Sequence, residues 1–182
     1  MTPVREPGPG TVLLSAADIA TIVARLGGEI SRDYAGRHPV LISLLKGGVV
    51  FLADLIRQIT IPHHIEFLQL SSYSGSTTSS GRVKILTDLE VSIAGRDIIL
   101  VEDVVDTGTT LAYIMEVLKL RNPASLEICA LLRKRIAQPS GIPVRYLGQE
   151  IPGRFVVGYG LDYRENFRHL PFIAALEPDP AA

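Results

Sequence analysis

The sequence predicts an α/β domain with a mainly parallel, twisted sheet flanked by helices. Short apolar runs typical of buried strands alternate along the chain with helical patterns, which is the arrangement of such sheets. The 182 residues suit one domain. A hydrophobic content of 47% is enough for a sizeable core. We therefore expect a single domain over residues 1–182.

The first predicted elements are a loose tail and a helix. Residues 1–10 are rich in proline and glycine and predict a frayed tail, as do residues 177–182. Ser15 followed by Asp18 is typical of a capped helix start. The apolar positions that follow recur at helical spacing: Ile19, Ile22, Val23 and Leu26.

Strands and helices then alternate. The apolar runs predict strands at residues 40–45, 65–70, 83–86, 98–101 and 126–132, with short late strands at 155–157 and 172–176. Residues 49–56 predict a helix after the break at Lys46-Gly47-Gly48. A second helix carries Leu111, Ile114, Met115 and Leu118 on one face and ends at Asn122-Pro123.

Residues 71–81 form a polar segment in the middle of the domain. Every residue there except Tyr73 is Ser, Thr or Gly, so the segment cannot bury enough apolar surface to stay ordered alone. A long polar loop in a compact domain predicts either a lid or a disordered excursion, and we favour a lid over residues 71–82.

Charge and cysteine content exclude several classes of function. The net charge of −1 gives no general basic field for DNA or RNA. The single cysteine, Cys129, excludes an internal disulfide and predicts a buried thiol within an apolar run. Neither a signal peptide nor a membrane-spanning run is recognisable in the sequence. We expect a cytoplasmic protein without a membrane partner.

The most informative segment is residues 98–110. A buried strand runs into two adjacent carboxylates, Glu102 and Asp103, and a small-residue turn then opens a helix. Ligands of open α/β sheets bind beyond the carboxyl ends of the strands, where we expect a polar loop over residues 102–110. The turn Thr107-Gly108-Thr109-Thr110 offers hydroxyls and backbone N–H groups to a phosphate.

Acids beside a phosphate site need an explanation, and two remain open. They bind ribose hydroxyls, or they act through Mg²⁺, which bridges carboxylates and phosphate oxygens. Helix capping alone accounts for Asp106 and Thr107. It does not account for Glu102 and Asp103 at the end of an apolar strand.

Residues 98–110 resemble the phosphoribosyl-pyrophosphate signature of the type I phosphoribosyltransferases. Further segments resemble the hypoxanthine-guanine members: a pyrophosphate loop at 45–48, a lid start at 71–73, a purine-reading Lys134 and a purine-binding hood at 150–163. The resemblance covers about residues 13–176 and implies a small hood made by the C-terminal and N-terminal segments. It also implies a cis peptide between Leu45 and Lys46.

The resemblance implies purine salvage. The enzyme would transfer 5-phosphoribosyl from phosphoribosyl pyrophosphate to hypoxanthine or guanine, giving IMP or GMP and pyrophosphate, with Mg²⁺ as cofactor. Asp106 would be catalytic, taking the N7 proton as N9 of the purine attacks. The phosphoribosyl group would be held by Glu102, Asp103, Asp106, Thr107, Gly108, Thr109 and Thr110.

The other implied roles fall on the remaining motifs. Lys46, Gly47 and Arg168 would bind pyrophosphate, and Ser72 and Tyr73 would begin the lid that excludes water. Lys134 would donate to the purine O6 and select 6-oxopurines over adenine. The purine-binding set would be Lys134, Phe155, Val156 and Asp162, and the Mg²⁺ ligands would be Glu102, Asp103 and Asp162.

Two other functions fit the same fold. One is a nucleotide-sensing RNA-binding regulator, which the net charge of −1 argues against. The other is a xanthine-preferring transferase, since Arg133, Ile136 and Gln149 depart from common versions of the family near the base. The resemblance suggests a homodimer or homotetramer with no nucleic-acid partner.

Overall fold

The main sheet of the protein has six strands in a computed structural model that describes residues 8–72, 83–135 and 141–177. The strand order is β4-β3-β2-β5-β6-β7, and only the β3–β4 pair is antiparallel. The predicted fold class is therefore confirmed. The strands are β2 Val40–Leu45, β3 His64–Ser72, β4 Val83–Thr87, β5 Asp97–Val105, β6 Ser125–Arg135 and β7 Tyr146–Pro152.

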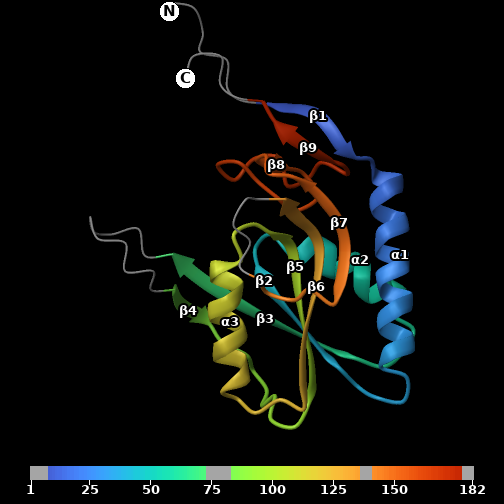
Figure 1. Ribbon diagram of the computed structural model, residues 1–182, viewed down its shortest axis with the longest axis vertical. Helices are drawn as coiled ribbons and strands as arrows, with labels where there is room; N and C mark the ends of the chain where they lie inside the picture. Colours follow the sequence, from blue (N-terminus) through green and yellow to red (C-terminus); the bar gives the residue numbers. More distant parts are fainter. Residues whose placement is uncertain (1–7, 73–82, 136–140, 178–182) are drawn as a thin grey trace, which may run out of the picture.

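Helices cover both faces of this sheet (Figure 1). α1 Ala16–Asp33 and α2 Val49–Gln58 lie on one face, and α3 Thr109–Lys119 lies on the other. β5 serves both sides, because successive side chains of a strand point to opposite faces. Ile99 packs in the cluster that contains α1 and α2, and Ile98 packs with α3. Within the described ranges, none of these helices is long and apolar enough to cross a membrane.

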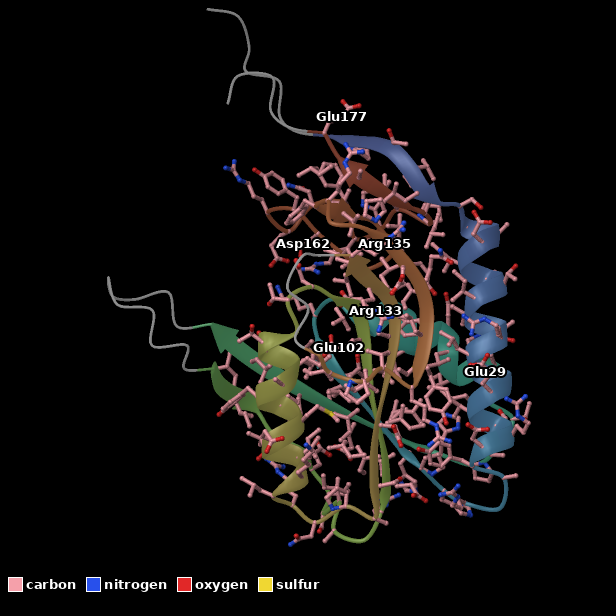
Figure 2. The ribbon with its side chains drawn as sticks, in the orientation of Figure 1. Glu29, Glu102, Arg133, Arg135, Asp162 and Glu177 are labelled. Carbon is pink, nitrogen blue, oxygen red and sulfur yellow. The ribbon has the colours of Figure 1, made fainter. Side chains whose placement is uncertain are left out.

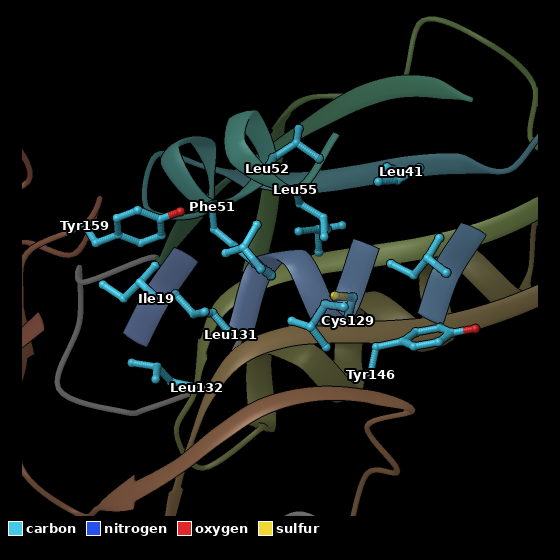
Figure 3. Close-up of a cluster of buried hydrophobic side chains, with 14 of the residues drawn as sticks. Ile19, Leu41, Phe51, Leu52, Leu55, Cys129, Leu131, Leu132, Tyr146 and Tyr159 are labelled. Atoms are coloured by element: carbon cyan, nitrogen blue, oxygen red, sulfur yellow. The ribbon is translucent and has the colours of Figure 1, made fainter. Parts of the chain in front are cut away.

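The larger core cluster lies between the sheet and the helices α1 and α2 (Figure 3). Cys129 on β6 is fully buried there, and burial raises the pKa of its thiol. The interpretation of Cys129 as a small core hydrophobe is confirmed. The start of α1 is also as predicted, since Ser15 and Asp18 exchange side-chain and backbone hydrogen bonds in a capping box.

A second, three-stranded antiparallel sheet stands at one end of the main sheet, in the order β1-β9-β8. It is made of β1 Pro9–Leu14, β9 Ile173–Leu176 and β8 Val156–Val157. This sheet and residues 158–172, which join β8 to β9, are called the hood below. The expectation of a frayed tail over residues 1–10 was wrong at its inner end, because Pro9 and Gly10 belong to β1, which pairs with β9.

Other boundaries also differ from the predictions. β5 continues to Val105, so Glu102 and Asp103 belong to the strand and not to a loop. β6 continues to Arg135, which places Lys134 within a strand and not after one. β7 was not predicted. It is an edge strand in which few side chains are buried, so its sequence lacks the continuous apolar run of a central strand.

The predicted lid falls mostly on residues outside the described ranges. Ser72 is the last residue of β3, and its backbone pairs with β4. Tyr73 and the rest of the segment to residue 82 lie outside the described residues.

Two leucines near the end of α3 offer a matched test of the core. Leu118 is fully buried in the smaller cluster, whereas Leu120 is 82% exposed. We expect Leu118→Ala to lower the free energy of unfolding by about 2–5 kcal/mol, because it removes buried methyl groups and leaves a cavity. Leu120→Ala should change it by less than about 0.5 kcal/mol. Urea unfolding followed by circular dichroism measures both, and equal effects would contradict this packing.

Candidate active site

A cleft of about 300 Å³ opens between the carboxyl ends of the central strands and the hood. It brings together predicted residues from four separate parts of the sequence. From the main sheet and its loops come Lys46, Gly47, Asp103, Asp106 and Lys134, and from the hood and the short connection that leads into it come Phe155, Val156, Asp162 and Arg168. These residues of the predicted site therefore line one cleft, although they lie far apart in the sequence.

A smaller pocket of about 170 Å³ lies beside the cleft. Thr107, Gly108 and Thr110 line it, and Asp106 lines both spaces. Gly108 precedes α3 with φ +79°, a left-handed conformation in which glycine meets no steric penalty. The first N–H groups of a helix lack partners within it, so this turn is chemically suited to a phosphate.

The two adjacent carboxylates of β5 face different spaces. Asp103 lines the larger cleft and Glu102 the smaller pocket, because neighbouring residues of a strand point to opposite faces. Glu102 is buried, and its Oε1 has no hydrogen-bond partner within the described residues. Burial raises the pKa of Glu102 well above its usual range, and the charge of Asp103 adds to the effect.

Asp103 is buried beneath the loop that follows β2. Its Oδ1 accepts a hydrogen bond from the backbone N–H of Val104 at 2.8 Å. Burial raises the pKa of Asp103, while that hydrogen bond and the charge of Arg168 oppose the rise. A Cβ at position 47 would come within 2.0 Å of Asp103 Oδ2, so glycine is needed there. The Leu45–Lys46 peptide is cis, as the resemblance implies.

Lys134 and Asp106 form the central ion pair of the cleft. Lys134 Nζ donates to Asp106 Oδ2 at 2.5 Å and lies 5.8 Å from the ring centroid of Phe155. The Lys134 side chain is 11% exposed, whereas Phe155 is 51% exposed. The rings of Phe155 and Tyr163 are nearly perpendicular, with 5.8 Å between their centroids. A half-exposed aromatic ring thus lies beside a hydrogen-bond donor, which itself contacts an acceptor.

The cations predicted to bind pyrophosphate both contact Glu165, which the sequence analysis missed. Lys46 Nζ donates to Glu165 Oε2 at 3.2 Å, and Arg168 Nη2 lies 3.3 Å from the same oxygen. These two contacts lower the pKa of Glu165. Arg168 also pairs with Asp162 Oδ1 at 2.7 Å. The only sequence signal for Glu165 is a carboxylate placed among arginines close to Asp162.

The predicted metal ligands do not form one cluster. No group of three or more Asp, Glu, His or Cys side chains is arranged to hold a metal ion in the described part of the chain. Asp103 and Asp162 line the larger cleft, and Glu102 does not. Mg²⁺ usually takes one or two protein carboxylates together with waters and substrate phosphates. The buried Asp103 carboxylate, with its raised pKa, is a donor that a cation at this position would stabilise.

The burial of Glu102 leads to a pH-dependent stability difference. The ordinary pKa of a glutamate is 4.5, so the unfolded chain loses this proton as the pH rises above that value. The folded protein keeps the proton to a higher pH, because its pKa is raised. The stability of the unliganded protein therefore falls as the pH rises from that value toward the folded pKa. We expect Glu102→Gln to raise the melting temperature near pH 8 and to change it little near pH 4.

Thermal unfolding across that pH range, without ligand, measures the effect. Glu116→Gln is the matched control, since Glu116 is exposed on α3 and pairs with Lys119. A Glu102→Gln protein that is less stable than the parent at pH 8 would contradict the burial cost assigned to Glu102.

Comparisons with known proteins agree with this geometry. Residues 11–164 match the model of the phosphoribosyl transferase domain family. The chain is 48% identical over 174 residues to a hypoxanthine-guanine phosphoribosyltransferase of Mycobacterium tuberculosis, covering 92% of this chain and 86% of that protein. The structure of this chain resembles that of a hypoxanthine phosphoribosyltransferase of Staphylococcus aureus, with a TM-score of 0.89. The two chains are 44% identical, and the match covers 96% of this chain and 95% of that one. A Bacillus anthracis hypoxanthine-guanine phosphoribosyltransferase gives a TM-score of 0.87 and 38% identity, over 95% of this chain and 100% of that one.

Proposed function

The chain belongs to the phosphoribosyl transferase family, as a hypoxanthine-guanine phosphoribosyltransferase of purine salvage, and from this premise we propose how its residues divide the reaction. The substrates would be phosphoribosyl pyrophosphate and a 6-oxopurine, and the products a purine nucleotide and pyrophosphate. N9 of the purine attacks C1′ of the ribose while the bond from C1′ to the pyrophosphate oxygen breaks. The positive charge that develops on the sugar needs nearby anionic groups.

The purine would lie on Phe155, between the partners Lys134 and Asp106. A 6-oxopurine carries O6 and N7 side by side on one edge. Lys134 would donate to O6, and the Asp106 carboxylate would accept the proton that leaves N7. The 2.5 Å contact between these side chains supports this assignment, because it places a donor and an acceptor next to each other beside the exposed Phe155 ring. Base stacking on such a ring is worth about 1–3 kcal/mol.

Pyrophosphate would bind across Lys46, Gly47 and Arg168, and Mg²⁺ would be held by Asp103 and Asp162 with the pyrophosphate oxygens. Bound there, the ion would neutralise charge that builds on the leaving group. Lys46 and Arg168 already hold an anion in the form of the Glu165 carboxylate, which supports their use as pyrophosphate ligands. The pyrophosphate would replace Glu165 on these two cations.

The 5′-phosphate would bind at the N-terminus of α3, on the hydroxyls of Thr107, Thr109 and Thr110 and the nearby backbone N–H groups. Figure 2 labels Glu102 on β5, which lines this smaller pocket, and Asp162 in the hood, which lines the larger cleft. Glu102 lines this pocket with Gly108, so we assign it to the ribose and not to the metal. Ser72 and Tyr73 keep the role of a lid as a prediction from resemblance.

The convergence of Lys134, Asp106 and Phe155 in one cleft carries the proposal, and a panel of bases tests it. We expect pyrophosphate release from phosphoribosyl pyrophosphate and Mg²⁺ with hypoxanthine and guanine, and none above background with adenine. Adenine presents an amino group where Lys134 requires an acceptor, and two facing donors cannot form a hydrogen bond. Xanthine, assayed in the same panel, shows how its rate of pyrophosphate release compares with those of hypoxanthine and guanine.

Two results would contradict the proposal. Turnover with adenine equal to that with hypoxanthine would remove Lys134 as the group that selects the base. Tight binding of the donor without turnover of any base would favour a nucleotide-sensing regulator. The homodimer or homotetramer suggested by the resemblance stays a prediction, which analytical ultracentrifugation measures directly.

A further inference from the structure

We propose that Tyr159 and Asp54 form a positioning pair that holds the hood against the pyrophosphate loop, residues 45–48, and so sets the affinity for pyrophosphate. The inference rests on the proposed function and adds two residues that contact neither the purine nor the sugar in that proposal. Its starting point is the hydrogen bond from Tyr159 Oη to Asp54 Oδ2, which is 2.7 Å long and partly buried.

Tyr159 is turned into the core by an unusual backbone. It has φ +52°, and the glycines on either side have φ +98° and +97°. A tyrosine in the left-handed region is uncommon and persists only where its surroundings fix it. Its own N–H donates to the Leu170 carbonyl, and its side chain is only 7% exposed within the larger core cluster. Figure 3 shows the ring beside Ile19 and Phe51.

The partner, Asp54, belongs to the helix that follows the pyrophosphate loop. α2 begins at Val49, directly after Gly48, so Asp54 lies less than about two turns from the loop. The two residues also line a cavity of about 360 Å³ between α1, α2 and the hood, on which Arg57 and Gln58 also border. Because side chains do not fill this cavity, the hydrogen bond between Tyr159 and Asp54 is a direct polar contact between the hood and α2 at this point.

The residue after Tyr159 transmits this anchoring to the loop. A Cβ at Gly160 would come within 2.4 Å of the Gly47 carbonyl oxygen, so the two backbones are in close contact. The Gly160 carbonyl accepts a hydrogen bond from Arg168 Nη1 at 2.7 Å, and the Gly160 N–H donates to the Arg168 carbonyl at 3.0 Å. The same turn therefore touches Gly47 and orients Arg168, two of the residues assigned to pyrophosphate.

Removing the hydroxyl should loosen this arrangement without emptying the core. We expect Tyr159→Phe to raise the KM for pyrophosphate about tenfold in the reverse reaction, from IMP and pyrophosphate, since small misplacements of binding groups have large effects. The KM for IMP should stay within about twofold of the parent value. Asp54→Ala should match Tyr159→Phe, whereas Asp54→Asn, which keeps an acceptor oxygen, should restore the parent KM.

A second tyrosine–aspartate hydrogen bond provides the control for a purely structural effect. Tyr146 Oη donates to Asp33 Oδ2 at 3.0 Å, and Tyr146 is 2% exposed, at the opposite end of α1 from the hood. Tyr146→Phe should lower the melting temperature as much as Tyr159→Phe does and leave both KM values unchanged. Titration calorimetry of pyrophosphate with Mg²⁺ gives a binding readout that does not depend on turnover.

The outcomes separate this inference from the proposed function. If the parent protein turns over hypoxanthine but Tyr159→Phe and Tyr146→Phe have the same pyrophosphate KM, the positioning role is wrong. If Asp54→Asn fails to rescue while Asp54→Ala is impaired, the hydrogen bond is not the active feature and the inference is also overturned. If the parent protein turns over none of the bases, the proposed function fails first.

Discussion

Replacing Asp106 by asparagine is expected to lower kcat with hypoxanthine by about 10²- to 10⁴-fold, the usual contribution of a positioned proton acceptor. The change removes a charge and a basic site but almost no volume. Asparagine can still accept the hydrogen bond that Lys134 donates at 2.5 Å, so the base site should keep its shape. The KM for phosphoribosyl pyrophosphate should stay within a few-fold, because Lys46, Gly47 and Arg168 are untouched.

Steady-state kinetics with both substrates varied separates the two parameters. Asp88→Asn is a suitable control, since Asp88 also forms a close ion pair, with Arg121, but lies outside the cleft. A loss of less than threefold in kcat for Asp106→Asn would contradict the assignment of Asp106 as proton acceptor. The remaining rate would then point to binding and electrostatics as the main contributions.

The second large effect is expected from Lys134→Ala. This substitution removes the donor to O6 and leaves the Asp106 carboxylate without its close cationic partner. A hydrogen bond to a charged group contributes about 1.5–3 kcal/mol, so kcat/KM for hypoxanthine should fall by about 10- to 150-fold. The change should appear mainly in the KM for the base, since Lys134 is assigned to binding and not to proton transfer.

Arg133→Ala is the matched control for Lys134→Ala. Arg133 precedes Lys134 on β6 and therefore points to the other face of the strand, where it pairs with Glu150 at 2.6 Å. Its removal should leave kcat/KM within about twofold, because exposed ion pairs contribute little. Equal losses in the two variants would show that the end of β6, rather than the Lys134 ammonium group, is what matters.

The part of the site that lies on one continuous motif was the most predictable. Residues 98–110 combine an apolar strand, acids and a small-residue turn within a short stretch, and the structure places Glu102 and Asp103 toward the carboxyl end of β5 and the turn before α3. The boundary was wrong because a central strand covered on both faces can carry acids at its end when they face a site. The misplaced boundary also hid the separation of Glu102 and Asp103 into two spaces, because side chains alternate between faces only within a strand.

The contacts between distant segments were harder to predict. Glu165 meets Lys46 only after the hood has folded over the sheet, and no local pattern reports that distance. β7 escaped notice because its sequence has neither a continuous apolar run nor a regular alternation of polar and apolar residues, and only Tyr146 and Ile151 are buried. Tyr159 was missed for a similar reason, since an aromatic side chain between two glycines is typical of a loop as much as of an anchor.

The pairing of β1 with β9 has a consequence for how the protein is made on the ribosome. Val12 pairs with Ala174, so almost the whole described chain must be synthesised before the small sheet closes. The six-stranded sheet joins segments that are nearer in sequence, and such contacts form at lower entropic cost. The nascent chain would thus complete its phosphate-binding turn long before its purine site. Full activity would appear only after β9 has left the ribosome and paired with β1.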